Sequence, residues 1–123
     1  MPSLKEFIEI EQRDALGITA RIELRRAPWA FEGHFPAKAL LPGVIQLAWV
    51  RELCSLWLDE PCTLQGVPQM KFVKPVIPED TLRLTLSRAE PNARKIAFTY
   101  DILLDAQALA ASHGKVELAP HAL

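Results

Sequence analysis

The feature that most constrains this chain is an apolar, helix-like stretch over residues 42–58. Proline at position 42 suits the first helical turn, because its missing N–H would have no intrahelical partner there. The polar interruptions of the stretch are Gln46, Arg51, Glu52 and Ser55. A helix that is apolar on nearly every side is normally buried rather than laid on a surface. The sequence therefore predicts one long helix at the centre of the fold.

The rest of the chain has the alternating pattern of β-strands. Apolar and polar residues alternate cleanly over residues 18–24, 81–86 and 95–104, which is typical of strands with one buried face. Further strands are predicted over residues 5–12, 64–73 and 107–118. Gly66 and Pro68 predict that the strand over residues 64–73 is bent or lies at an edge of the sheet. Because a one-faced antiparallel sheet needs a cover, we expect an α+β fold in which the sheet wraps around the single helix.

Length, composition and charge limit the function classes. With 123 residues, half of them hydrophobic, the chain predicts a single domain over residues 1–123. A net charge of −1 argues against a nucleic-acid binder. The scattered positions of His34, His113 and His121, and of Cys54 and Cys62, predict no metal site, and no cofactor is expected. No apolar run suggests a signal peptide or a membrane span, so the cytoplasm is the expected location.

His34 is the strongest candidate for chemistry. It lies in a loop that Gly33, Pro36 and Pro42 punctuate, directly before the start of the helix. The first turn of a helix presents unpaired N–H groups and a partial positive charge. An imidazole beside such donors in apolar surroundings is suited to act as a base next to a carbonyl-binding site. The alternative is that His34 only caps or braces the loop.

Two sequence blocks carry a resemblance to a known family. The first is Gly-His-Phe-Pro at 33–36 followed by Leu-Pro-Gly-Val at 41–44, and the second is the stretch from Lys71 to Leu84 with its Lys-Phe and Pro-Val elements. In this order and spacing they resemble the hot-dog-fold 3-hydroxyacyl-acyl-carrier-protein dehydratases. The run from Pro42 to Trp49 resembles most closely the thioester dehydrase branch associated with aryl polyene biosynthesis.

The resemblance implies a hot-dog fold and a lyase that converts 3-hydroxyacyl thioesters to trans-2-enoyl thioesters in fatty-acid or aryl-polyene synthesis. It makes His34 the base and places backbone N–H groups near Gly43 at the thioester carbonyl. In these enzymes an acid from the partner subunit's helix serves the hydroxyl, and its position here is occupied by Ala48, which cannot transfer a proton. The substrate-binding residues implied are Gly33, Phe35, Pro42, Gly43, Val44, Gln46 and Ala48.

Three explanations for the missing acid remain open. Glu52 lies one helical turn beyond Ala48 on nearly the same face and could supply the proton; the alternative for Glu52 is a solvated or ion-paired residue. Gln46 or a water molecule could orient the hydroxyl while His34 carries the proton both ways. The chain could also have stopped dehydrating, acting instead as a hot-dog acyl thioesterase or as a non-catalytic subunit that pairs with an active homologue.

The expected partners are an acyl carrier protein and further copies of the chain. Carrier proteins are acidic, and Lys71 and Lys74 flank a motif that lies near the tunnel mouth in the resembling enzymes, so they could dock one; scattered solvated charge is the alternative. The exposed sheet edge and the apolar surface around the helix predict a homodimer, or a higher homo-oligomer of dimers.

Overall fold

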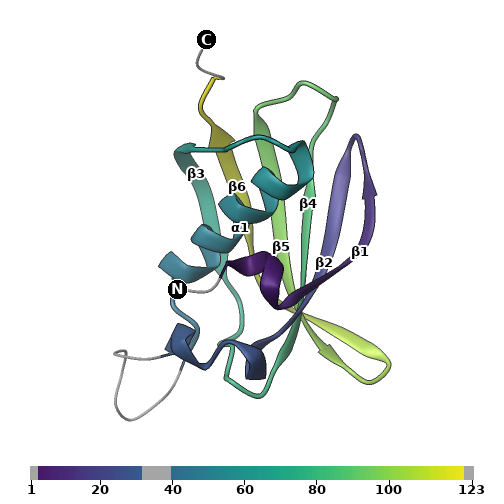
Figure 1. Ribbon diagram of the computed structural model, residues 1–123. Coiled ribbons are helices and arrows are strands. Elements are labelled where there is room, and N and C mark those ends of the chain that lie inside the picture. The colour runs from purple at the N-terminus through teal and green to yellow at the C-terminus, as the bar shows by residue number, and fades with distance from the viewer. Residues whose placement is uncertain (1–2, 32–39, 121–123) are drawn as a thin grey trace.

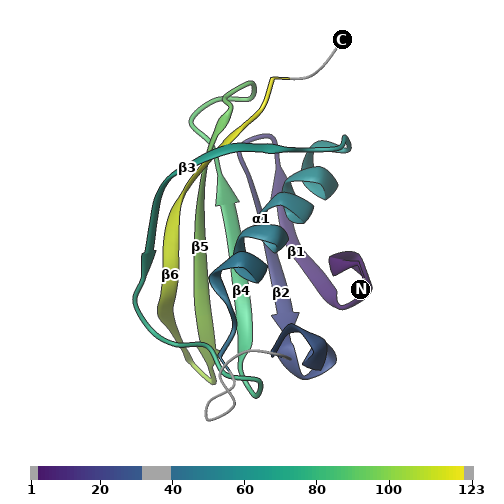
Figure 2. The same ribbon diagram turned by 90° about the vertical axis from the view of Figure 1, so that its left-hand side faces the viewer.

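One long helix lies across the inner face of a curved sheet in the computed structural model, which describes residues 3–31 and 40–120 (Figures 1 and 2). The helix, α1, spans Gly43–Leu58. Six strands form the sheet in the order β1-β2-β4-β5-β6-β3, and every neighbouring pair is antiparallel. The expected α+β arrangement of an antiparallel sheet wrapped around one central helix is confirmed.

The strand bounds follow the alternation of the sequence closely in the second half of the chain. The strands are β1 (Ile8–Asp14), β2 (Gly17–Glu23), β3 (Leu64–Phe72), β4 (Thr81–Ser87), β5 (Lys95–Leu104) and β6 (Gln107–Leu118). In β4 every second residue is buried, and β5 repeats the pattern until Leu104, which is exposed at the end of the strand. Burial of one face per strand is what a period of two residues produces.

The core lies between the inner face of the sheet and one side of α1. The helix residues buried there are Gln46, Trp49, Val50, Leu53, Cys54 and Trp57. The opposite side of the helix is not covered within one chain, since Val44 is 69% exposed and Leu47 and Ala48 are only half-buried. The expectation of a helix buried on nearly every side is therefore only partly met, because a single sheet covers a single side.

Both ends of α1 have identifiable determinants. Pro42 precedes the helix in an extended conformation, and its carbonyl accepts hydrogen bonds from the N–H groups of Ile45 and Gln46. At the other end Asp59 adopts a left-handed conformation with φ of 53°, which stops the helix. The guanidinium of Arg13 donates to the carbonyls of Leu56 and Trp57, at 3.0 and 2.7 Å. Strand β1 thus caps the last turn of the helix.

The start of the chain differs from the sequence prediction. Residues 5–12 were expected as one strand, whereas a 3-10 helix, η1 (Leu4–Glu6), precedes β1. The Glu6 carboxylate accepts a hydrogen bond of 2.6 Å from the Ser3 N–H, which stabilises the turn. Phe7, which was predicted as a strand residue, follows η1 directly and is buried, and so is Leu4, which precedes the predicted strand.

An aromatic cluster packs η1 and the segment after β2 against α1. Two 3-10 helices, η2 (Leu24–Arg26) and η3 (Pro28–Phe31), follow β2. Trp29 from η3 contacts Phe7 and Trp49 edge-to-face, with ring centroids 5.9 and 6.2 Å apart, and Phe7 lies 5.7 Å from Trp49. Such pairs add specific aromatic attraction to the area they bury. The cluster holds the segment that leads to residue 31 against the helix.

Strand β3 lies at the edge of the sheet, as Gly66 and Pro68 predict. It pairs only with β6, and its register shifts between Leu64 and Gly66 and again between Gly66 and Gln69.

Over residues 3–31 and 40–120, the structure contains no helix that is both long and apolar enough to span a bilayer.

Candidate active site

The predicted site residues divide into two groups. Gly33, His34 and Phe35 lie outside the described residues. Pro42 and Gly43 lie at the start of α1, and the other predicted residues follow on the helix: Val44, Gln46, Ala48 and Glu52. The part of the site that the structure describes is therefore built on the first three turns of α1.

A cavity of about 360 Å³ adjoins the start of the helix. It is bounded by the segment that enters α1, by the helix itself and by the chain that leaves β3. The lining residues are Leu40, Leu41, Gln46, Phe72, Val73, Lys74, Pro75 and Val76. An apolar wall with few polar groups is the usual character of a site for an organic ligand. Lys74, one of the two predicted docking lysines, lies at this cavity, and Lys71 is exposed on β3 nearby in the chain.

Gln46 is the polar side chain of the cavity wall contributed by the helix. Its Oε1 accepts a hydrogen bond of 2.6 Å from the Ser112 hydroxyl, and its Nε2 donates to the carbonyl of Leu41 at 3.3 Å. The Tyr100 hydroxyl donates to the Gln46 main-chain carbonyl at 2.5 Å. Burial raises the pKa of Tyr100 well above 10.0, with the negative charge of Glu52 adding to the rise, so the hydroxyl keeps its proton.

Gly43, at the first position of α1, has the ring of Phe72 as a close neighbour. A Cβ atom there would lie 2.8 Å from Cζ of the Phe72 ring. Phe72 is at the end of β3 and lines the cavity, so glycine lets this ring approach the helix start. The start of the helix thus packs on a ring that lines the cavity, and its first N–H groups, at Gly43 and Val44, precede those of Ile45 and Gln46, which donate to the Pro42 carbonyl.

Glu52 does not line this cavity. Its Oε1 accepts a hydrogen bond of 3.2 Å from the Leu4 N–H of η1. It lines a separate depression together with Ser3, Lys5 and Arg51. Ala48 is half-buried one turn earlier on the helix. Within one chain the structure therefore brings Gln46 to the cavity and Gly43 to the Phe72 ring that lines it, whereas Glu52 lies elsewhere.

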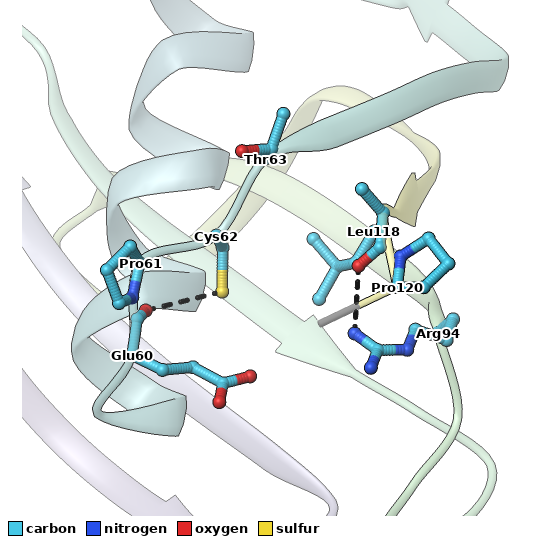
Figure 3. Close-up of a pocket in the computed structure, with 8 residues that line it drawn as sticks. Glu60, Pro61, Cys62, Thr63, Arg94, Leu118 and Pro120 are labelled. Carbon is cyan, nitrogen blue, oxygen red and sulfur yellow. Dashed lines mark hydrogen bonds between the residues drawn. The ribbon is translucent and has the colours of Figure 1, made fainter. Parts of the chain in front are cut away.

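A further cavity of about 350 Å³ lies at the opposite end of α1 (Figure 3). Cys62, in the chain after the helix, and Arg94, the residue before β5, both line it, and Arg94 donates to the Ala119 carbonyl at 2.9 Å. Burial raises the pKa of the Cys62 thiol, which disfavours the reactive thiolate. No residue predicted for the site lines this cavity.

Two buried hydrogen-bond partners of Gln46, Ser112 and Tyr100, were not predicted for the site from the sequence. Both are inward-facing on their strands and fully buried. A serine at an inward position of a strand needs a hydrogen-bond partner, which is the signal that could have identified Ser112.

Among the described residues no group of three or more His, Cys, Asp or Glu side chains is arranged to hold a metal ion.

Comparison with known proteins identifies relatives of this site and fold. The family model described as ApeI dehydratase (ApeI-like) matches residues 9–115. A curated 3-hydroxyacyl-[acyl-carrier-protein] dehydratase FabZ from Roseiflexus castenholzii is 41% identical over 61 residues, covering 44% of this chain and 43% of the relative. The FabZ of Acetivibrio thermocellus is 39% identical over 61 residues, covering 44% and 42%. The match thus spans less than half the length of these curated relatives.

Solved structures extend the likeness over most of the chain. The dehydratase heterocomplex ApeI:P from Xenorhabdus doucetiae contains a chain that is 30% identical, with a TM-score of 0.77 over 91% of this chain and 95% of that one. Mouse thioesterase superfamily member 2, at 11% identity and a TM-score of 0.64 over 92% and 82% of the two chains, shares the fold alone. The fold is thus the hot-dog fold, and the resemblance drawn from residues 33–44 and 71–84 is confirmed. The chain belongs to the ApeI-like family of hot-dog dehydratases.

Proposed function

We propose that this protein removes water from a 3-hydroxyacyl thioester carried on an acyl carrier protein and releases the trans-2-enoyl thioester. The observation that carries the proposal is the cavity between the start of α1 and the end of β3. Its wall is mainly apolar, which suits an acyl chain, and the helix N–H groups beside it suit a thioester oxygen. Membership of a dehydratase family supports the same reaction.

The reaction needs a base, a stabiliser of negative charge and an acid. In the proposal His34 removes the proton from C2 of the substrate, and negative charge develops on the thioester oxygen beside the N–H groups near Gly43. The C3–O bond then breaks, and the hydroxyl leaves with a proton as water. Gly33, Phe35, Pro42, Val44, Gln46 and Ala48 complete the proposed substrate-binding wall.

Glu52 is the candidate acid on this chain. Because Glu52 and Gln46 line different cavities of one chain, the proposed role requires Glu52 to serve a site on another subunit. Glu52 is half-buried one turn from Ala48 and lines a depression that is open to solvent, which suits that arrangement. The proposal therefore includes a homodimer, or an oligomer of dimers, as the active form. The exposed edge of β3 is the surface proposed for pairing.

A second candidate is a subunit that works only beside a different homologous chain. Two observations favour it: Ala48 stands where the resembling dehydratases carry an acid, and the Xenorhabdus relative forms a dehydratase heterocomplex. In that case a partner chain would supply the proton donor, and the purified protein alone would not dehydrate.

Mass spectrometry of carrier-bound thioesters separates the candidates. The purified protein is incubated with a 3-hydroxybutanoyl thioester of an acyl carrier protein, and the loss of one water is followed. Formation of the enoyl thioester by this chain alone supports the dehydratase. Activity only after addition of a homologous dehydratase subunit supports the second candidate. Release of the free acid would contradict both and identify a thioesterase.

A further inference from the structure

Two polar side chains are buried among the apolar residues that the structure describes, and they contact each other. Gln46 is 3% exposed and Ser112 is fully buried. Burial of an amide or a hydroxyl lowers stability unless each group finds a hydrogen-bond partner. An apolar pair of similar volume would fill this space without that requirement. The presence of the polar pair therefore calls for an explanation beyond packing.

Ser112 determines which way the Gln46 amide points. The serine hydroxyl donates to Oε1 at 2.6 Å, so the Nε2 end of the amide is turned away from β6 and towards Leu41. The Tyr100 hydroxyl holds the main-chain carbonyl of Gln46 from β5. The side chain and the main chain of Gln46 are thus fixed by two neighbouring interior strands of the sheet, β6 and β5.

Leu41 is held from two directions at the point where the chain enters α1. Its carbonyl accepts the hydrogen bond from Gln46 Nε2 at 3.3 Å, and its N–H donates to the carbonyl of Val76 at 2.9 Å. The following Pro42 carbonyl accepts from the N–H groups of Ile45 and Gln46. One continuous set of hydrogen bonds therefore runs from Ser112 through Gln46 and Leu41 to Val76.

This set of hydrogen bonds borders the cavity. Gln46, Leu41 and Val76 line it, and the Phe72 ring that packs on Gly43 lines it as well. Three regions that are distant in the sequence are joined here: the entry to α1 with its first turn, the chain after β3, and β6. A shift of the Leu41 backbone would move the first N–H groups of the helix relative to the cavity.

We propose that Gln46 is a positioning residue, oriented by Ser112, that sets the place of the Leu41–Pro42–Gly43 backbone at the cavity. The consequence for catalysis rests on the proposed function, because the N–H groups near Gly43 are the proposed partners of the thioester oxygen. The structural part of the inference stands on the hydrogen bonds alone. Misplacement of a reacting group by about 1 Å can lower a rate by about a hundredfold.

A double-mutant cycle distinguishes positioning from stability. Ser112→Ala alone leaves Gln46 Oε1 without its donor, and Gln46→Met alone leaves the Ser112 hydroxyl without its acceptor, so each single variant should have a lowered Tm. The double variant removes both orphaned groups, so its Tm should be higher than the sum of the single effects predicts. Positioning is lost in all three variants. Ser112→Thr keeps a hydroxyl that can donate to Gln46 Oε1, so its Tm, its uptake in residues 40–47 and its kcat should stay close to those of the wild type.

Two readouts follow the position of the backbone. Deuterium uptake of a peptide covering residues 40–47 should rise in both single variants and in the double variant. With the 3-hydroxybutanoyl carrier-protein substrate, kcat should fall about tenfold or more in the double variant while KM changes little, because the affected interaction acts on the developing charge. Val116→Ala, a truncation on the same inward face of β6, should lower the Tm without raising uptake in residues 40–47 or lowering kcat.

Wild-type uptake in the double variant would overturn the inference, and so would a Val116→Ala variant that changes uptake and kcat to the same extent. Wild-type kcat in the double variant would overturn its catalytic part. If the wild-type protein does not dehydrate the substrate, the proposed function fails and the uptake measurements alone decide the positioning role. The two failures are therefore distinguishable.

Discussion

The carboxylate of Glu52 accepts a hydrogen bond of 3.2 Å from the backbone N–H of Leu4, which joins α1 to η1 across 48 positions of sequence. Leu4 is fully buried, so this contact helps to hold η1 against the helix. The proposed acid is therefore also a structural acceptor. A test of its chemistry must keep an oxygen at this position, which glutamine does and alanine does not.

Replacing Glu52 with glutamine should keep the fold and remove dehydration. The amide oxygen can still accept the Leu4 N–H, whereas the amide cannot donate and recover a proton, and the expected loss of kcat is about a hundredfold or more. Urea unfolding should change by less than about 1 kcal/mol. Glu52→Ala, the matched control, should lose about 1–2 kcal/mol of stability with the lost hydrogen bond. Unchanged kinetics in Glu52→Gln would leave His34 and water as the remaining candidates.

Replacing His34 with alanine should leave the fold intact and remove most of the activity. A general base typically contributes about a hundredfold or more to the rate. The Tm of the variant should stay close to that of the wild type, as measured by circular dichroism, because the residue is predicted to lie in a loop. Turnover near the wild-type level would rule out the assigned base.

Assembly should depend on the β3 edge. Val67 on β3 is exposed, and so are Phe72 and Val73 at the end of the strand. Val67→Asp should weaken association because it places a charge on the proposed pairing surface. Ile10→Asp, on the opposite edge strand β1 and similarly exposed, is the control and should not. A monodisperse wild-type monomer in light scattering at micromolar concentration would contradict the proposed assembly.

Gly114 on β6 should tolerate no side chain. A Cβ atom there would lie 2.2 Å from the Gln69 carbonyl oxygen and 2.9 Å from Cα of Met70, both of them backbone atoms of β3. Gly114→Ala should therefore lower the unfolding free energy by about 1–3 kcal/mol or more, because the two strands must separate. At Gly66 no atom lies within 4 Å of the added Cβ, so Gly66→Ala should change stability by less than about 0.5 kcal/mol. Equal effects in denaturant unfolding would refute this account of β3–β6 packing.

Cys54 should contribute to the loss of stability at alkaline pH. Burial raises the pKa of its thiol from 9.0 to about 12, and the nearby Cys62 adds to the rise. The unfolded chain therefore releases this proton at lower pH than the folded chain does. The stabilisation is fully present below about pH 9 and is lost as the pH rises towards about 12.

Urea unfolding on either side of pH 9 measures this effect. The unfolding free energy of the wild type should fall as the pH rises, and Cys54→Ala should show a shallower fall. Tyr100, whose pKa burial also raises, keeps part of the slope in the variant. Identical slopes in both proteins would show that Cys54 is not protected in the folded state.

The amino-acid sequence by itself determined most of the secondary structure. The bounds of β5 and β6 and the end of α1 agree with the predictions for residues 95–104, 107–118 and 58. These elements follow from local patterns: a period of two residues in the strands, and an apolar stretch closed by turn residues in the helix. The edge position of β3 was also predictable, because Gly66 and Pro68 weaken a central strand.

Only the tertiary structure decided how the polar residues of α1 are used. Gln46 and Glu52 are both polar interruptions of an apolar helix, and the pattern alone does not separate them. Folding places Gln46 against Ser112, 66 positions later in the chain, and Glu52 against Leu4, 48 positions earlier. The 3-10 turn at residues 4–6, which overlaps the predicted strand 5–12, is stabilised both by the local Ser3–Glu6 hydrogen bond and by the distant one between Leu4 and Glu52. Hydrogen-bond partners that distant in sequence exist only once the sheet has wrapped around the helix, so no local pattern encodes them.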